Sequence, residues 1–303
     1  MNYGKLISRA FQITLRHRFL WLLGILAGGA GGSFQYSYGG GEDQYGRVDS
    51  FDHVAAWALA HLPLIILLGL ALFLIVIFFV VLSIIAKAGL IASVADIEEQ
   101  QPVSFANGMD AGYHAFWRVL GVDLLVGLAI LFTIACAALP VVALVLTEHF
   151  FAAVVVGVSL LLPLIAVFIY LGLLLMYAER LAVVAPAGVI ASLTGAHRIL
   201  FGFKGPVLLV WLIAIALGTG ISLATFLAVL VIALPHIAAG IAVYYKLGLM
   251  PTLIYAAVPA LMLFATGLLL SGIANTFKAS YWTLAYLELT KPPAQPTPEP
   301  LPA

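Results

Sequence analysis

Residues 63–86 read PLIILLGLALFLIVIFFVVLSIIA, and this uncharged run decides the class of fold. A helix needs roughly 20 apolar residues to cross a bilayer, so the run predicts a transmembrane helix. Uncharged runs at 124–147, 150–178, 205–245 and 247–277 predict four more spans. The run 205–245 is too long for one span, so we expect its end to lie along the membrane interface. Residues 19–41 are a sixth and weaker candidate, because their second half is rich in glycine.

The composition supports a membrane protein. Apolar residues make up 64% of the chain and charged residues 9%, whereas soluble proteins average about 45–50% and about 25%. Membrane lipids are therefore the expected surroundings. The charge balance, 13 basic against 13 acidic residues, gives no basic surface for nucleic acid. The single cysteine, Cys136, excludes a disulfide framework and offers no metal cluster.

Three similar stretches introduce the apolar runs, and each ends in a histidine followed by large apolar residues. They are ISRAFQITLRHRFLW (7–21), SFANGMDAGYHAFWRVL (104–120) and VIASLTGAHRILFGF (189–203), with His17, His114 and His197. A second histidine set, His53, His149 and His236, recurs at comparable intervals in the predicted outer turns. This periodicity indicates three tandem units at about 1–101, 102–186 and 187–291, which form a single integral membrane domain.

The expected fold is therefore an all-α polytopic membrane protein. Six transmembrane helices would form three tandem helical hairpins, each preceded by an interfacial amphipathic helix. In the first of these helices, Ile7, Ala10, Phe11 and Leu15 share one face, which is typical of a helix lying among lipid headgroups. Ser104 is the predicted N-cap of the second. The proline-rich residues 292–303 have the composition of a disordered tail.

The positive-inside rule orients this arrangement. With six spans and a cytoplasmic N-terminus, most lysine and arginine residues fall on the cytoplasmic side, and only Arg47 and Lys246 fall outside. Both termini are therefore expected in the cytoplasm. A cleaved signal peptide is an alternative for the N-terminus, but such a segment has no reason to share its pattern with two internal ones.

The stretches SFANGMDAGYHAFWRVLGVDLL and GVIASLTGAHRILFGFKGP carry a resemblance of layout. An amphipathic helix followed by a helical hairpin resembles largely uncharacterised bacterial six-span membrane proteins. These are similar to the membrane domain attached to some glycerophosphodiester phosphodiesterases. The resemblance implies the bacterial inner membrane, but it implies no catalytic residues, because no soluble phosphodiesterase barrel is present in the sequence.

Chemical motifs are sparse. The chain has no H-E-x-x-H helix, phosphate-binding loop or dinucleotide fingerprint, so we expect no enzyme and no cofactor. Asp123 lies just inside a predicted span, where ionisable residues are costly and often functional. It could relay ions, or it could pair with Arg118 or Lys87. The six patterned histidines allow a zinc hypothesis, although interfacial anchoring explains them more simply.

Gly24, Gly28 and Gly32 recur at four-residue steps and predict close helix packing, with a dimer interface as the alternative. Two functions compete on the sequence alone. The first is a non-catalytic membrane component that organises lipid or partner proteins, with a membrane-protein partner or a homo-oligomer as possible assemblies. The second is a transporter or channel for a small or lipidic substrate, which would use repeated units, kinked helices and Asp123.

Overall fold

Long helices make up almost all of the described chain. The computed structural model describes residues 2–31, 57, 59 and 61–291, and no strand occurs among them. Three predictions fall outside these residues: the patterned histidine His53, the packing glycine Gly32 and the proline-rich tail at 292–303. The helices are α1 (Tyr3–Arg16), α2 (Phe19–Gly31), α4 (Leu62–Glu98), α5 (Phe105–Leu146), α6 (Phe150–Val184), α7 (Val189–Gly202), α8 (Lys204–Leu247) and α9 (Leu249–Thr290).

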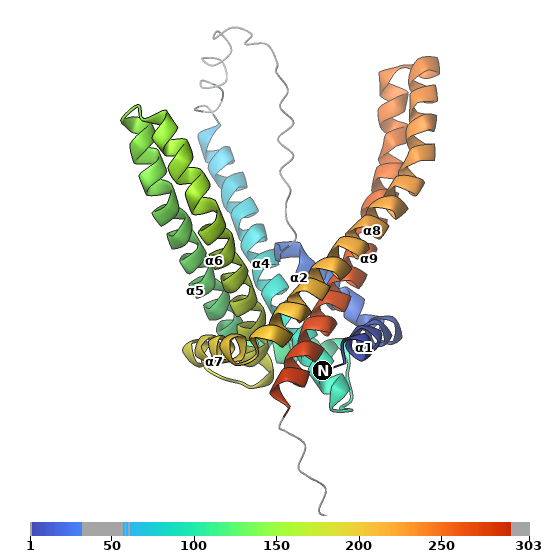
Figure 1. Ribbon diagram of the computed structural model, residues 1–303. Coiled ribbons are helices and arrows are strands. Elements are labelled where there is room, and N and C mark those ends of the chain that lie inside the picture. The colour runs from blue at the N-terminus through green and yellow to red at the C-terminus, as the bar shows by residue number, and fades with distance from the viewer. Residues whose placement is uncertain (1, 32–56, 58, 60, 292–303) are drawn as a thin grey trace, which may run out of the picture.

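The long helices diverge from a common base into three arms (Figure 1). We define the arms as residues 62–82 of α4, residues 127–170 of the α5–α6 hairpin and residues 225–271 of the α8–α9 hairpin. The base comprises α1, α2, α7 and the remaining parts of the long helices. Both ends of the described chain, Asn2 and Lys291, lie at the base (Figure 1). Each long helix contributes about 20 residues, or about 30 Å, to its arm, which matches the hydrocarbon thickness of a bilayer.

Tight turns close the two hairpins at the tips of their arms. Glu148 has φ 61° between α5 and α6, and Gly248 has φ 85° between α8 and α9. Glycine carries little penalty in this left-handed region, so the second hairpin can reverse over a single residue. Each pair of helices then runs antiparallel along its whole arm (Figure 1).

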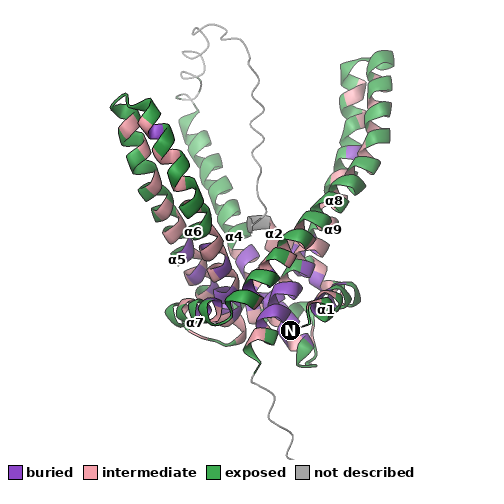
Figure 2. Cartoon of the chain, in the orientation of Figure 1, coloured by how far each residue is buried: buried purple, intermediate pink, exposed green. Residues whose placement is uncertain are grey.

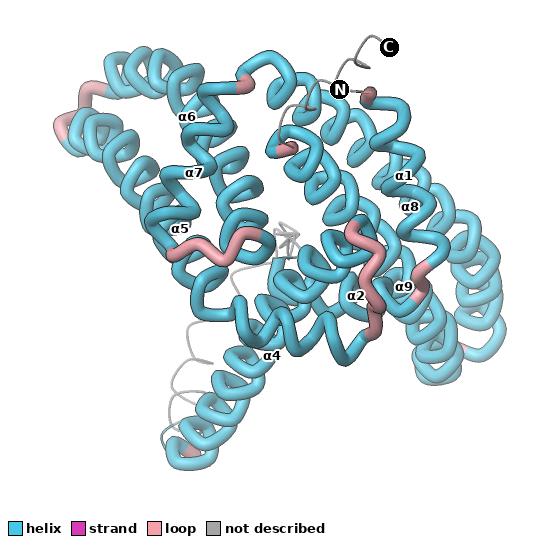
Figure 3. The backbone as a smooth tube through the Cα atoms, turned by 90° about the horizontal axis from the view of Figure 1, so that it is seen from below, coloured by secondary structure: helices cyan, strands magenta, loops and turns pink. Residues whose placement is uncertain are grey.

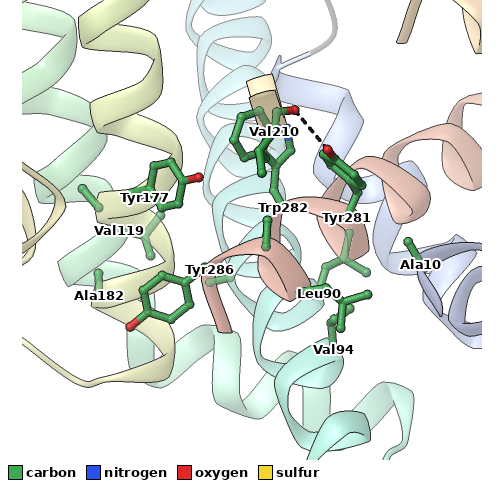
Figure 4. Packing of buried hydrophobic residues seen from close by; sticks show 14 of the residues in the cluster. Ala10, Leu90, Val94, Val119, Tyr177, Ala182, Val210, Tyr281, Trp282 and Tyr286 are labelled. Carbon is green, nitrogen blue, oxygen red and sulfur yellow. Dashed lines mark hydrogen bonds between the residues drawn. The ribbon is translucent and has the colours of Figure 1, made fainter. Parts of the chain in front are cut away.

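Most buried side chains gather at the base, whereas the arms are largely exposed or half-buried (Figure 2). Leu90, Val119, Tyr177 and Tyr281 are at most 2% exposed and belong to one continuous core (Figure 4). Residues 61–80, by contrast, are all exposed in the isolated chain. These residues are apolar apart from His61, and lipid is as apolar as leucine, so an arm of this kind is stable in a membrane without protein neighbours.

Glycines allow the helices of the base to approach closely. A methyl group on Gly24 would overlap the Gly272 carbonyl oxygen of α9, and one on Gly28 would overlap the Asn275 amide. Two hydrogen bonds fix this crossing of α2 and α9. The Thr276 hydroxyl donates to the Leu20 carbonyl at 2.9 Å, and the Asn275 amide donates to the Gly24 carbonyl at 3.1 Å. The two glycines therefore pack within one chain.

A second glycine crossing joins α4 to α5. A methyl group on Gly89 would overlap the Gly108 carbonyl oxygen, and one on Gly112 would overlap the Ile85 carbonyl oxygen. Gly108 and Gly112 are four residues apart, so they repeat the small-xxx-small pattern that the sequence analysis found only in residues 24–32.

The described chain is all-helical, as predicted, and contains five of the six predicted spans as long apolar helices; the sixth is not confirmed. Five helices, α4, α5, α6, α8 and α9, are long and apolar enough to cross a membrane. The sixth candidate, α2, has 13 residues, or about 20 Å, and the rest of the candidate lies outside the described residues. Run 205–245 is part of one helix of 44 residues, α8, which pairs with α9 to the tip of the third arm. The helix is continuous from Lys204 to Leu247.

The sequence predicts a separate second amphipathic helix. In the structure this helix is not a separate element. Residues 105–120 continue into the next span as the single helix α5. Ser104 caps this helix: its hydroxyl accepts a hydrogen bond from the backbone amide of Asn107 at 3.1 Å. Nothing between 118 and 124 stops a helix, since Gly121 and Asp123 are both tolerated in its interior. By contrast, α1 and α7 are separated from the following helices at His17 and Phe203.

The apolar face of α1 is only partly the predicted one. Ala10 is buried, together with Leu6 and Ile13, but Phe11 and Leu15 are 56% and 48% exposed. The helix turns its small and branched residues toward the base, where it packs against α9. The two larger residues therefore point away from the protein.

Candidate functional site

Three long helices meet at a cluster of charged side chains just below the arms. Lys87 on α4 lies between Asp123 on α5 and Glu179 on α6. Its Nζ is 2.9 Å from Asp123 Oδ2 and 2.9 Å from Glu179 Oε1. Arg180, the next residue of α6, places Nη1 3.6 Å from Glu179 Oε2. We call these four residues the ion cluster. Its two cations balance its two carboxylates.

The α6 side of the ion cluster is buried more deeply than the rest. The side chains of Glu179 and Arg180 are 5% and 4% exposed, whereas those of Lys87 and Asp123 are 32% and 24% exposed. Arg180 Nη1 also donates to the Met176 carbonyl. Charges in such surroundings are stable only when they are paired, so each carboxylate depends on its cation.

Two polar atoms of the ion cluster lack a hydrogen-bond partner within the described chain. They are Asp123 Oδ1 and Arg180 Nε, both buried. An unpaired buried polar atom costs free energy, so such atoms mark either strain or a place for an additional partner. Asp123 Oδ1 belongs to the more exposed half of the ion cluster.

Aromatic side chains link the ion cluster to the parts of α8 and α9 that lie in the base. Tyr177, one helical turn before Arg180, meets the ring of Trp282 on α9 edge to face, with 5.9 Å between ring centroids. Tyr281, the residue before Trp282, donates a hydrogen bond to the Val210 carbonyl of α8 at 3.0 Å (Figure 4). These contacts connect α6, α8 and α9 at the level where the arms diverge.

Only part of this site was predicted from the sequence. Asp123 pairs with Lys87, one of the two partners considered for it, and no ion pair of Arg118 is found within 2–31 or 61–291. Glu179 and Arg180 were not predicted as part of a site. One signal could have found them: an adjacent acid and base directly after the long uncharged run 150–178.

The described histidines do not converge on one centre. His17 ends α1 and has a buried Nδ1 without a partner, while His114 lies 3.7 Å from Asp110 within α5. His197 Nδ1 lies 2.8 Å from the Tyr170 hydroxyl, and His236 Nδ1 lies 3.5 Å from the hydroxyl of Tyr255. His149 contacts the Thr147 carbonyl in the α5–α6 turn, and His61, which lies outside the predicted pattern, has Nδ1 2.9 Å from the Trp57 carbonyl oxygen. In the part of the chain that the structure describes, no three potential metal ligands come together.

Grooves lie around the base and where the second arm leaves it. A groove of about 610 Å³ separates α1 from the ends of α4 and α9, and another of about 710 Å³ lies between α1 and the α4–α5 loop. A third, of about 400 Å³, opens between α6, α8 and α9, and its lining is Ile165, Phe168, Ile169, Gly172, Leu173, Met176, Trp211 and Trp282. We call it the arm groove. None of these three grooves is lined by Lys87, Asp123 or Glu179.

Comparison of the chain with protein-family models, with curated proteins and with solved structures finds no match.

Proposed function

We propose that this chain is a non-catalytic, membrane-organising component whose splayed arms hold lipid or the spans of a partner protein between them. One observation carries the proposal. The arms diverge above a tightly packed base (Figures 1 and 2), and most of their exposed side chains are apolar. In a membrane, such surfaces are covered by acyl chains or by other apolar helices.

The arm groove supports this function. It lies where the second arm leaves the base, and its lining includes two tryptophans but no charged residue. An acyl chain or an apolar helix fits this chemistry better than a hydrated solute does. The ion cluster, in turn, balances its own charges and ties three helices together, which suits a scaffold.

The proposal includes a location and an orientation. The charged residues of the described long helices lie at the base or at the tips, which carry Glu148 and Lys246. The base holds most of the cations, so the positive-inside rule orients it toward the cytoplasm of a bacterial cell, with the arms in the inner membrane.

A photo-crosslinking experiment tests this function. A photoreactive amino acid at Phe73, in the exposed first arm, should capture lipid or a second protein in native membranes. The same group at Leu90, which is buried in the core, is the matched control and should react only within the chain. Phe73 adducts no more frequent than those at Leu90 would reject the proposed function.

A transporter is the second candidate, and one observation favours it. The ion cluster places two carboxylates around one lysine beside the membrane-embedded arms, and Asp123 Oδ1 has a free acceptor position. Arrangements of this kind relay protons or ions in membrane proteins. An Asp123→Asn variant in sealed proteoliposomes would lose a solute-coupled proton flux if the chain is a transporter. A flux that persists in this variant would exclude Asp123 as the relay.

A further inference from the structure

A shallow groove between α6 and α7 combines basic, aromatic and apolar side chains. It measures about 430 Å³ and is lined by Tyr170, Leu174, Leu193, Thr194, His197 and Arg198. The helix α7 crosses the base beside α6 (Figure 3). A methyl group on Gly195 of α7 would overlap the Leu181 side chain of α6, so the two helices are in close contact. We call this the α7 groove.

The polar side of the α7 groove presents hydrogen-bond donors. Tyr170 and His197 lie 2.8 Å apart through the hydroxyl and Nδ1. When the tyrosine donates, the neutral imidazole carries its proton on Nε2, and a protonated imidazole carries one there as well. Nε2 is therefore a donor whenever the tyrosine donates to Nδ1, and also in the protonated imidazole. Arg198 is exposed, and no carboxylate of the described chain pairs with it.

An aromatic side chain places a second cation near the same groove. The Phe201 ring lies 4.5 Å from the His197 ring and 6.3 Å from the Tyr170 ring, between centroids. Lys204 Nζ lies 5.0 Å from the centroid of the Phe201 ring, a cation–π distance. Arg198 and Lys204 thus give this end of α7 a positive charge that no acid of the structurally described residues offsets.

The position of the α7 groove identifies the source of its ligand. Tyr170 is the last residue of the second arm, so the groove lies where the membrane-embedded part of α6 meets the base. Leu174 and Leu193 provide an apolar wall beside the donors. Aromatic and basic residues at this level are typical of the headgroup layer of a membrane. A phosphate attached to acyl chains satisfies both sides of the groove, whereas free phosphate satisfies only one.

We propose that the α7 groove binds the phosphate headgroup of an anionic phospholipid. Arg198 and His197 Nε2 donate to the phosphate oxygens, Lys204 adds a favourable charge, and the two leucines contact the start of the acyl chains. This inference deepens the proposed function, because it gives a membrane-organising protein a site for one class of lipid.

Native mass spectrometry of the full chain in detergent tests the site. The protein is titrated with phosphatidylglycerol and, separately, with phosphatidylcholine of the same acyl chains. The wild type should prefer phosphatidylglycerol. A basic residue near a lipid surface contributes a factor of about five in affinity. Arg198→Gln should therefore weaken phosphatidylglycerol binding about fivefold and leave phosphatidylcholine binding unchanged.

Two variants and one competitor complete the experiment. Lys246→Gln removes another exposed cation, at the far tip of the third arm, and should bind phosphatidylglycerol like the wild type. His197→Gln should also weaken binding, because it loses the imidazole donor. Inorganic phosphate at millimolar concentration should leave the bound lipid in place, and its displacement would show a site for free phosphate instead.

The proposal is wrong if Arg198→Gln and Lys246→Gln bind phosphatidylglycerol equally well, or if the wild type does not distinguish the two lipids. This outcome is separate from the test of function. Crosslinking at Phe73 could fail while the α7 groove still selects the anionic lipid. Crosslinking could also succeed while the groove shows no lipid preference.

Discussion

Replacing Lys87 with methionine tests the ion cluster most sharply. The change removes the cation that lies 2.9 Å from both Asp123 Oδ2 and Glu179 Oε1. At an effective dielectric constant of about 20, each contact contributes about 6 kcal/mol of attraction before desolvation is counted. Most of this attraction offsets the cost of burying the charges, so breaking a buried pair typically costs about 3–5 kcal/mol. Because the Lys87 side chain is 32% exposed, we expect a loss near the lower end, about 3 kcal/mol.

The assay is unfolding in mixed detergent with increasing sodium dodecyl sulfate, followed by tryptophan fluorescence. The double variant Lys87→Met/Asp123→Asn supplies the control. It removes the second charge of the broken pair, while Arg180 stays beside Glu179 and neutralises it. We expect the double variant to recover most of the lost free energy of unfolding. A Lys87→Met protein that unfolds at the wild-type detergent fraction would refute this account, as would a double variant less stable than the single one.

Three further changes give smaller effects in the same assay. Gly24→Ala should destabilise the chain by about 1–3 kcal/mol, because the new methyl group meets α9. Gly218 has open space around it, so Gly218→Ala should be neutral or stabilise the chain by up to about 1 kcal/mol. Equal effects of the two changes would contradict the glycine crossing. Tyr281→Phe loses the hydrogen bond to the Val210 carbonyl and should cost about 1 kcal/mol; no loss would show that this bond does not join α8 to α9. Arg9→Gln breaks the pair with Glu98, which is 2.6 Å long but exposed, and should change stability by less than about 1 kcal/mol; a larger loss would mean that α1 depends on this pair.

The sequence predicted the class of fold because uncharged runs report directly on contact with lipid. Residues 63–86 lie within α4, and its portion up to residue 80 is exposed, as expected of a lipid-facing helix. The patterns near charges were less informative. Hydropathy does not distinguish a helix that ends at the interface from one that continues through it, and for this reason the continuity of α5 past Asp123 was missed.

The candidate site was partly predictable. Asp123 and Lys87 were singled out because a charge beside an apolar run needs a partner. Glu179 could not be assigned to them from the sequence, because it lies 92 residues from Lys87 and the pairing depends on how α6 packs against α4. The arm groove has no local pattern at all, since its lining comes from three helices.

The environment of the first arm tests the central claim most directly. A spin label at position 73 of α4, in the protein reconstituted into lipid vesicles, reports its accessibility to oxygen and to a water-soluble nickel complex. If the arms hold lipid, the label should be accessible to oxygen and shielded from nickel. A partner helix at this face would shield it from both. High accessibility to nickel would mean that water fills the space between the arms, and it would contradict the membrane-organising function.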